Sequence, residues 1–220
     1  MKQRNQLIRL VQYFAGLEIL ALGGAFSIVA GQGTTPVNAL PYVLSQIFES
    51  NIRFWMMLLM GIYLLFQGIL LKKFHWSNIV QLLVGLLYGV FVDWNLLLVG
   101  SEVPFGVIGI ILYIILSIFL VSLGITLYVD AGILQMPTEG LISAMATKYP
   151  KRWPFHRGKV FTDTILVVLA IFLGIVFLGE MRGVGIGTIV SAMLIGQMVH
   201  VFQKLLTLIR NRCSDEQMEG

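Results

Sequence analysis

Residues 20–40 read LALGGAFSIVAGQGTTPVNAL, and residues 121–141 read VSLGITLYVDAGILQMPTEGL. Aligned without gaps, the two stretches match at two glycines and one proline: Gly23 with Gly124, Gly31 with Gly132, and Pro36 with Pro137. Asn38 falls on Glu139. Leucine and alanine match easily by chance in an apolar chain, whereas glycine and proline do so less often. The pattern therefore indicates a duplicated unit, which decides how the rest of the chain is interpreted.

The composition is that of a membrane protein. Of the 220 residues, 57% are hydrophobic and only 12% are charged. Several nearly uncharged stretches exceed the length of about 18 residues that identifies a spanning helix. We expect one polytopic membrane domain, residues 1–220, that is all-α with six transmembrane helices. The spans lie at roughly 7–30, 53–71, 77–99, 105–129, 160–179 and 184–208, uncertain by about 2–4 residues at each end.

The basic residues predict the orientation of the spans. Lysines and arginines cluster before the first span, after the second, between the fourth and fifth, and after the sixth: Lys2, Arg4, Arg9, Lys72, Lys73, Lys148, Lys151, Arg152, Arg157, Lys159, Arg210 and Arg212. Because such clusters face the cytoplasm, we expect both termini of this cell-membrane protein to be cytoplasmic. Each copy of the unit, about 7–99 and about 105–209, then holds three spans. An odd number makes the second copy inverted, with 210–220 a cytoplasmic tail.

A short segment follows the first span of each copy. Residues 37–48 and 138–147 each come after a glycine-proline break and are too short to cross a bilayer. We interpret them as broken, re-entrant helices, which are tolerated at depth where protein or a watery cavity covers them. Amphipathic segments lying flat on the membrane surface are the open alternative. Inverted repeats whose broken helices meet near the midplane are typical of secondary transporters.

These residues resemble the YczE/YyaS/YitT-like family of bacterial membrane proteins. The likeness covers most of the chain and is best at Gly31-x-Gly33-Thr34-x-Pro36, at Gly85 through Asp93, at Pro137 with Glu139, and at Gly185-x-Gly187-Thr188. The resemblance implies the inverted-repeat fold and a suspected transport role. The chain departs from the family at Asn38 and Glu139, where such proteins commonly carry aspartate.

Ionisable side chains within spans are costly, at roughly 2.5–3.5 kcal/mol each on insertion scales, and so suggest function. Those that stand out are Glu18, Asp93, Asp130, Glu139, Asp163 and His200. Glu18 and Glu139 are the preferred proton-linked or cation-facing acids, and Asp163 is expected to reach the cytoplasmic interface near Lys159. Ion pairs that pin two helices together are the structural alternative. With polar residues of the junctions and helix stripes, the predicted solute site comprises Glu18, Thr35, Asn38, Tyr88, Asp93, Tyr128, Glu139 and His200.

Other chemistries find little support in the sequence. The run Gly183-x-Gly185-x-Gly187 follows no strand, so a nucleotide-binding loop is rejected. The three histidines are scattered and the single cysteine is Cys213, so we expect no metal and no cofactor. No catalytic triad or pair stands out, so we expect no enzyme and no catalytic residues. The basic loops set topology and touch lipid headgroups, and nucleic acid is not an expected partner.

We expect a transporter that moves a small organic solute by alternating access between inverted repeats. A pocket with acids and aromatic rings suits an amine, a zwitterion or a vitamin-like molecule. Two other classes stay open. One is the substrate-binding membrane subunit of an energy-coupled vitamin importer, which the six spans and the row of small residues Ala21 and Ala25 would suit. The other is a non-transporting structural or lipid-handling protein. A second copy of the chain, in a homodimer, is a further partner that the sequence leaves open.

Overall fold

The structure is a computed structural model that describes residues 6–72, 76–100, 102, 103, 105–181 and 183–216. The side chains of 76–79 and 211–216 are not part of that description. Lys2, Arg4 and Lys73 lie outside the described residues, as do the side chains of Ser77, Arg212 and Cys213.

Every regular element in the described residues is a helix. The chain runs through α1 (Gln6–Val29), α2 (Pro36–Ile47), α3 (Ile52–Leu71), α4 (Trp76–Val99), α5 (Gly106–Ala131), α6 (Pro137–Lys148), α7 (Phe155–Leu173), the π-helical turn η1 (Gly174–Leu178) and α8 (Ile186–Glu216). Six of these helices, with α7 extended by η1, are long and apolar enough to cross a membrane. The all-helical fold with six spans is thereby confirmed. The fifth span begins at Phe155 rather than near residue 160, which matters for the site below.

The two short helices begin alike. Both α2 and α6 have 12 residues and open with proline in the first turn, where its fixed φ suits the helix and its missing N–H costs nothing. Each follows a long helix that ends at a glycine with positive φ, 65° at Gly31 and 63° at Gly132. The predicted bounds, 37–48 and 138–147, are therefore right to within one residue at each end.

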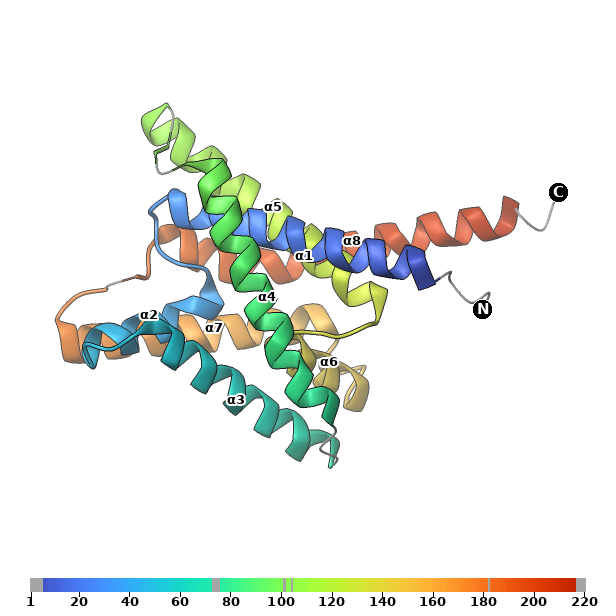
Figure 1. Cartoon of the computed structure of the whole chain (residues 1–220), viewed down its shortest axis with the longest axis horizontal. Helices are drawn as coiled ribbons and strands as arrows, with labels where there is room; N and C mark the ends of the chain where they lie inside the picture. Colours follow the sequence, from blue (N-terminus) through green and yellow to red (C-terminus); the bar gives the residue numbers. More distant parts are fainter. Residues whose placement is uncertain (1–5, 73–75, 101, 104, 182, 217–220) are drawn as a thin grey trace.

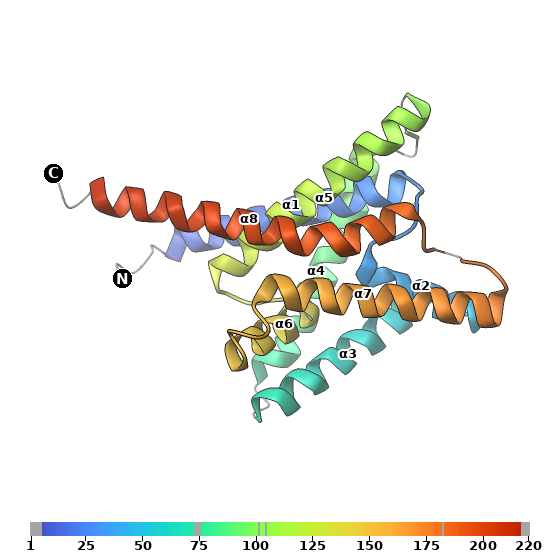
Figure 2. The ribbon, with the colours of Figure 1, turned by 180° about the vertical axis from the view of Figure 1, so that it is seen from behind.

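Helices α1 and α5 form the centre of the molecule and lie side by side (Figures 1 and 2). Glycines allow their backbones to touch. A Cβ added at Gly23 would lie 2.7 Å from the Val121 amide nitrogen, and one added at Gly124 would lie 2.5 Å from the Leu20 amide nitrogen. Positions 20 and 121 correspond in the repeat alignment, as do 23 and 124, so the two contacts are reciprocal.

The other helices pack in matching pairs. α1 packs on α4 as α5 packs on α8, and α2 packs on α7 as α3 packs on α6. This is the pattern expected of a duplicated unit, whose inverted relation stays a prediction. One pair departs from it: α7 packs closely on α8, whereas α3 and α4 touch at few positions. In the second half, α7 and α8 are therefore packed together, whereas the corresponding helices of the first half, α3 and α4, are separated.

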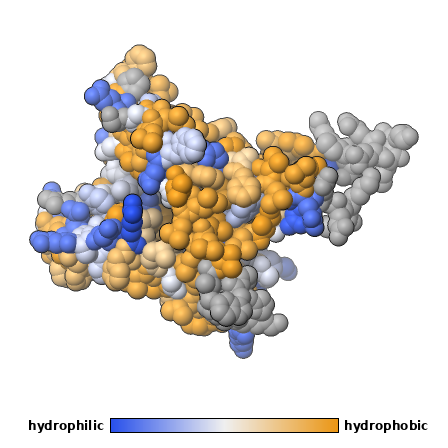
Figure 3. Space-filling model, viewed as in Figure 1, coloured by the Kyte–Doolittle hydropathy of each residue, from blue (hydrophilic) through white to orange (hydrophobic). Residues whose placement is uncertain are grey.

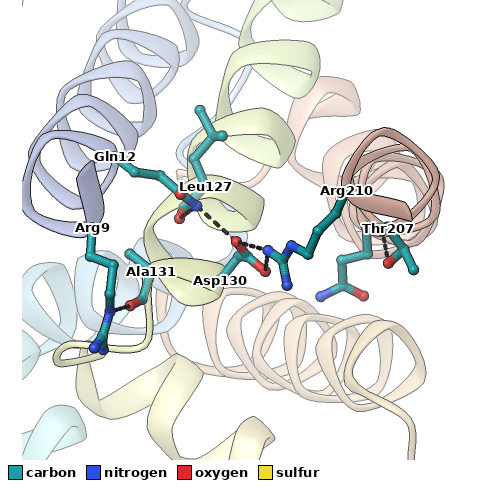
Figure 4. Close-up of polar contacts among 8 residues, drawn as sticks. Arg9, Gln12, Leu127, Asp130, Ala131, Thr207 and Arg210 are labelled. Carbon is teal, nitrogen blue, oxygen red and sulfur yellow. Dashed lines mark hydrogen bonds and ion pairs between the residues drawn. The ribbon is translucent and has the colours of Figure 1, made fainter. Parts of the chain in front are cut away.

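The molecule has two polar ends and an apolar middle. The start of α1 and the end of α8 lie at the same end (Figures 1 and 2), and hydrophobic residues cover most of the middle in Figure 3. At the end near the termini, a polar network joins three helices (Figure 4). Both Gln12 on α1 and Arg210 on α8 donate to Asp130 near the end of α5, at 2.9 Å and 2.8 Å. Asp130 is therefore a structural residue.

Candidate functional site

A small cavity lies where the N-terminal turns of α2 and α6 meet. Its volume is about 60 Å³, which is room for a few water molecules or one small polar group. Helices α1, α3, α4, α5, α7 and α8 complete its wall. It is lined by Leu20, Thr35, Pro36, Val37, Asn38, Met56, Met60, Tyr88, Val121, Ile125, Met136, Thr138, Glu139, Lys159, Asp163 and Ile195. We call it the central cavity.

Three buried charges border the central cavity on one side. Lys159 Nζ lies 3.1 Å from Asp163 Oδ1 and 3.5 Å from Glu139 Oε1, and each of the three side chains is at most 3% exposed. Lys159 and Asp163 are four residues apart on α7, so they share a face of that helix. Glu139 reaches them from the first turn of α6. If both acids are ionised, the cluster carries one negative charge more than Lys159 balances.

One oxygen of each carboxylate remains available. Glu139 Oε2 and Asp163 Oδ2 are buried and find no hydrogen-bond partner within the described part of the chain. An unpaired buried acceptor costs about 1–3 kcal/mol, and more when it is charged. Both oxygens therefore favour a donor, which a proton, water or a cationic ligand can supply.

The N-terminal ends of two helices also border the central cavity. Thr35 and Met136 precede α2 and α6, and neither makes a side-chain capping hydrogen bond. The first-turn N–H groups of a helix point toward its N-terminal end and carry a partial positive charge. Because residues of both first turns line the cavity, two such ends face one space.

A larger groove opens between α3 and α4, where these helices separate. Its volume is about 490 Å³, and three methionines of α3 form much of its wall: Met56, Met57 and Met60. Arg53 and Asp93 also line it. We call it the α3–α4 groove. It shares residues with the central cavity, namely Thr35, Asn38, Met56, Met60 and Tyr88, so the two spaces adjoin.

The structure brings together six of the eight residues that the sequence predicts for the site. Four of them line the central cavity: Thr35, Asn38, Tyr88 and Glu139. Tyr128 on α5 is fully buried with its hydroxyl near Glu139, and Asp93 lines the α3–α4 groove.

The other two predicted residues lie elsewhere. The carboxylate of Glu18 accepts a hydrogen bond from Asn95 Nδ2 at 2.8 Å, and Glu18 lines neither space. Asn95 also donates to the Phe91 carbonyl oxygen. His200 stacks against His156 with the ring centres 4.1 Å apart, between α8 and α7. Both contacts join neighbouring helices.

Sequence reasoning missed two of the three charged residues. Asp163 was expected at the cytoplasmic interface, but it is fully buried, and this expectation is wrong. The physical reason is that α7 begins at Phe155, one turn before Lys159, so both residues lie inside the bundle under α6. The spacing of Lys159 and Asp163 was the signal, because opposite charges four residues apart in a helix form a pair.

Among the described residues, no group of three or more histidine, cysteine, aspartate or glutamate side chains is arranged to hold a metal ion. The groups that face the central cavity are suited to hydrogen bonding and charge pairing with a small polar molecule.

Comparison with known proteins points to relatives of similar length. The sequence profile of DUF6198, a family of unknown function, matches residues 7–204. YyaS, an uncharacterized protein of Bacillus subtilis strain 168, is 26% identical over 200 residues, which cover 90% of this chain and 94% of YyaS. YczE, an uncharacterized membrane protein of the same strain, is 29% identical over 197 residues, which cover 89% of this chain and 85% of YczE. No solved structure matches.

Proposed function

The chain belongs to the DUF6198 family, and we propose that it transports a small organic solute with a basic amine across the cell membrane. The observation that carries the proposal is the buried cluster of Glu139, Asp163 and Lys159 beside a cavity formed by two helix N-termini. A charged group buried in a membrane protein is costly and is by default a candidate for a functional site.

The charges of the cluster favour an amine. The two free carboxylate oxygens are acceptors, and the cluster has one more acid than base. An ammonium group would supply both the missing donors and the missing positive charge. The N-terminus of α2, which has no acidic residue in its first turn, would attract a negative group of the same solute. A zwitterion with one amine and one carboxylate therefore fits the charges around the cavity.

The helix packing supports alternating access. The α3–α4 groove leads from the first turn of α3 to the central cavity, and Met60 and Tyr88 line both spaces. The equivalent helices of the second half, α7 and α8, are packed together. We propose that the protein alternates between this arrangement and one in which α3 and α4 close while α7 and α8 separate.

The importer-subunit alternative loses one argument. The small residues Ala21 and Ala25 suit such a subunit in the sequence, but both are fully buried within the chain and offer no surface to another protein. A subunit of that kind would bind solute but would transport it only with an ATPase module.

Binding is tested by the thermal unfolding of the purified protein with a panel of small amines and their N-acetylated analogues. We expect amines to raise the melting temperature, and the uncharged analogues to have no effect. Glu139→Gln should weaken amine binding about 10- to 100-fold, the usual value of a hydrogen bond to a charged group. Glu18→Gln is the matched control, because Glu18 is another acid in a span but lies away from the cavity.

Two results would count against the proposal. The first is a panel in which no amine stabilises the protein. The second is unchanged binding in Glu139→Gln. For an amine that binds, uptake into proteoliposomes that contain this chain alone separates a carrier from an importer subunit.

A further inference from the structure

A third space lies on the other side of the first turn of α6. It has a volume of about 360 Å³ and is lined by residues near the end of α3, the start of α4, the loop before α6, and α6 itself, among them Gln67, Gln81 and Gly140. We call it the glutamine cavity. The α3–α4 groove is lined by the opposite ends of the same two helices, from Ile52 and Leu96, so the two spaces open toward opposite ends.

Unpartnered polar atoms gather between the glutamine cavity and the central cavity. Six buried side-chain atoms have no hydrogen-bond partner within the described residues: Tyr63 Oη, Gln67 Oε1, Gln81 Oε1, Tyr128 Oη, Glu139 Oε2 and Asp163 Oδ2. Glu139 and Asp163 line the central cavity, Gln67 and Gln81 line the glutamine cavity, and the two amide oxygens face Gly140.

Gly140 leaves the space into which these amides point. A Cβ at this position would lie 2.6 Å from Gln81 Oε1 and 3.0 Å from Gln67 Oε1. Both glutamines are 7% exposed, so their amides point inward. Buried polar groups that the protein does not satisfy are usually bridged by ordered water. A chain of such waters would connect the glutamine cavity with Glu139.

We propose that Glu139 exchanges its proton through the glutamine cavity while α3 and α4 are separated, that it exchanges it with the other side in the alternate arrangement, and that this proton is the coupling ion of transport. In the protonation step, a hydronium ion gives its proton to Glu139 Oε2 and is left as water. With Glu139 neutral, Lys159 and Asp163 form a balanced pair, so the negative charge that would hold an amine is lost. The coupling rests on the proposed function, whereas the proton route does not.

The surroundings of Glu139 favour this route over the α3–α4 groove. The titratable groups that face it are Lys159 and Asp163 from α7, Tyr63 from α3, Tyr88 from α4 and Tyr128 from α5. The first turn of α2 contributes no titratable side chain. Among the described residues, the buried side chains with an unpartnered polar atom include Gln67 and Gln81 of the glutamine cavity and none that lines the α3–α4 groove.

The test is infrared spectroscopy of the purified full-length protein without solute. A pH titration should show a carboxylic acid band that is absent from Glu139→Gln. The rate at which this band shifts after transfer to heavy water measures access to the Glu139 proton. We expect Gly140→Ala and the double variant Gln67→Leu/Gln81→Leu to slow the shift at least tenfold. Gly61→Ala on α3 is the matched control, since a Cβ there meets nothing within 4 Å.

The outcomes are distinct. Slowed exchange in both variants supports the route, and exchange at the unaltered rate overturns it. The absence of a titrating Glu139 band overturns proton coupling. If the double variant does not fold, the single glutamine variants and Gly140→Ala apply the same test. If no amine binds but exchange slows as expected, the proposed function fails and the proton route stands.

Discussion

Lys159 is the residue on which the buried charges depend. It is 3% exposed and is within ion-pair distance of both Glu139 and Asp163. Removing a charge from water costs several kcal/mol, which only close partners can offset. A lysine at this depth is stable because two acids share it, and the acids are stable because they share the lysine. Each of the three therefore constrains what can replace the others.

We predict that Lys159→Met destabilises the protein by about 3–5 kcal/mol at neutral pH, the usual effect of breaking a buried ion pair from one side. Protonation of the acids removes their uncompensated charge, so the loss should shrink as the pH falls. Thermal unfolding in detergent across a pH series measures both effects. The double variant Lys159→Met/Asp163→Asn should recover part of the stability. A Lys159→Met protein as stable as the parent at neutral pH would show that the cluster is not a charged one.

The residues of the site could be predicted where the repeat marks them, and not elsewhere. Asn38 and Glu139 stand at equivalent positions after the two prolines, and both line the central cavity. In the sequence, Lys159 ends a run of basic residues, and such a run indicates which side of the membrane a loop faces. Glu18 has the sequence signature of a functional acid, yet Asn95 from another helix satisfies it. Contacts between helices that are distant in sequence decide such cases, and one sequence alone does not reveal them.

At the scale of the element, glycine and proline made most of the fold predictable. Gly31 with Pro36 and Gly132 with Pro137 set the ends of four helices, because few residues other than glycine tolerate a positive φ at a helix end. The separation of α3 from α4 had no such signal. Their sequences are as apolar as those of α7 and α8, so the sequence does not show which pair is open.

The close backbone contact between α1 and α5 can be tested by adding one methyl group to it. We expect Gly124→Ala to destabilise the protein by about 1–3 kcal/mol, the range of an overpacked core. The added methyl would lie 2.5 Å from the Leu20 amide nitrogen and 2.7 Å from the Gly16 carbonyl oxygen, and backbone atoms do not move aside as a side chain can. Gly61→Ala serves as the control and should melt close to the parent. Equal melting temperatures for the two variants would contradict the close backbone packing.

At the scale of the whole molecule, the charges divide the bundle into two unlike ends. Among the residues whose side chains the structure describes, basic ones are more numerous near the chain termini than at the other end: Arg9, Lys72, Lys148, Lys151, Arg152, Arg157, Lys204 and Arg210. Arg53 is at the other end, together with Glu49, Glu102 and Glu180. This asymmetry favours an orientation with the termini in the cytoplasm. The α3–α4 groove would then open outward and the glutamine cavity inward.

Cys213 makes that orientation measurable, since it is the single cysteine of the chain and follows the last span, which ends at Arg210. We expect a membrane-impermeant maleimide to leave Cys213 unmodified in intact cells and to modify it after permeabilisation. In the matched variant Cys213→Ser/Glu102→Cys, the cysteine lies in the loop between α4 and α5 and should react in intact cells. The reverse labelling pattern would show that the protein lies in the membrane with its termini outside the cell. The glutamine cavity would then draw protons from outside, and the α3–α4 groove would receive its solute from the cytoplasm, so the same two spaces would describe an exporter driven by inward proton flow.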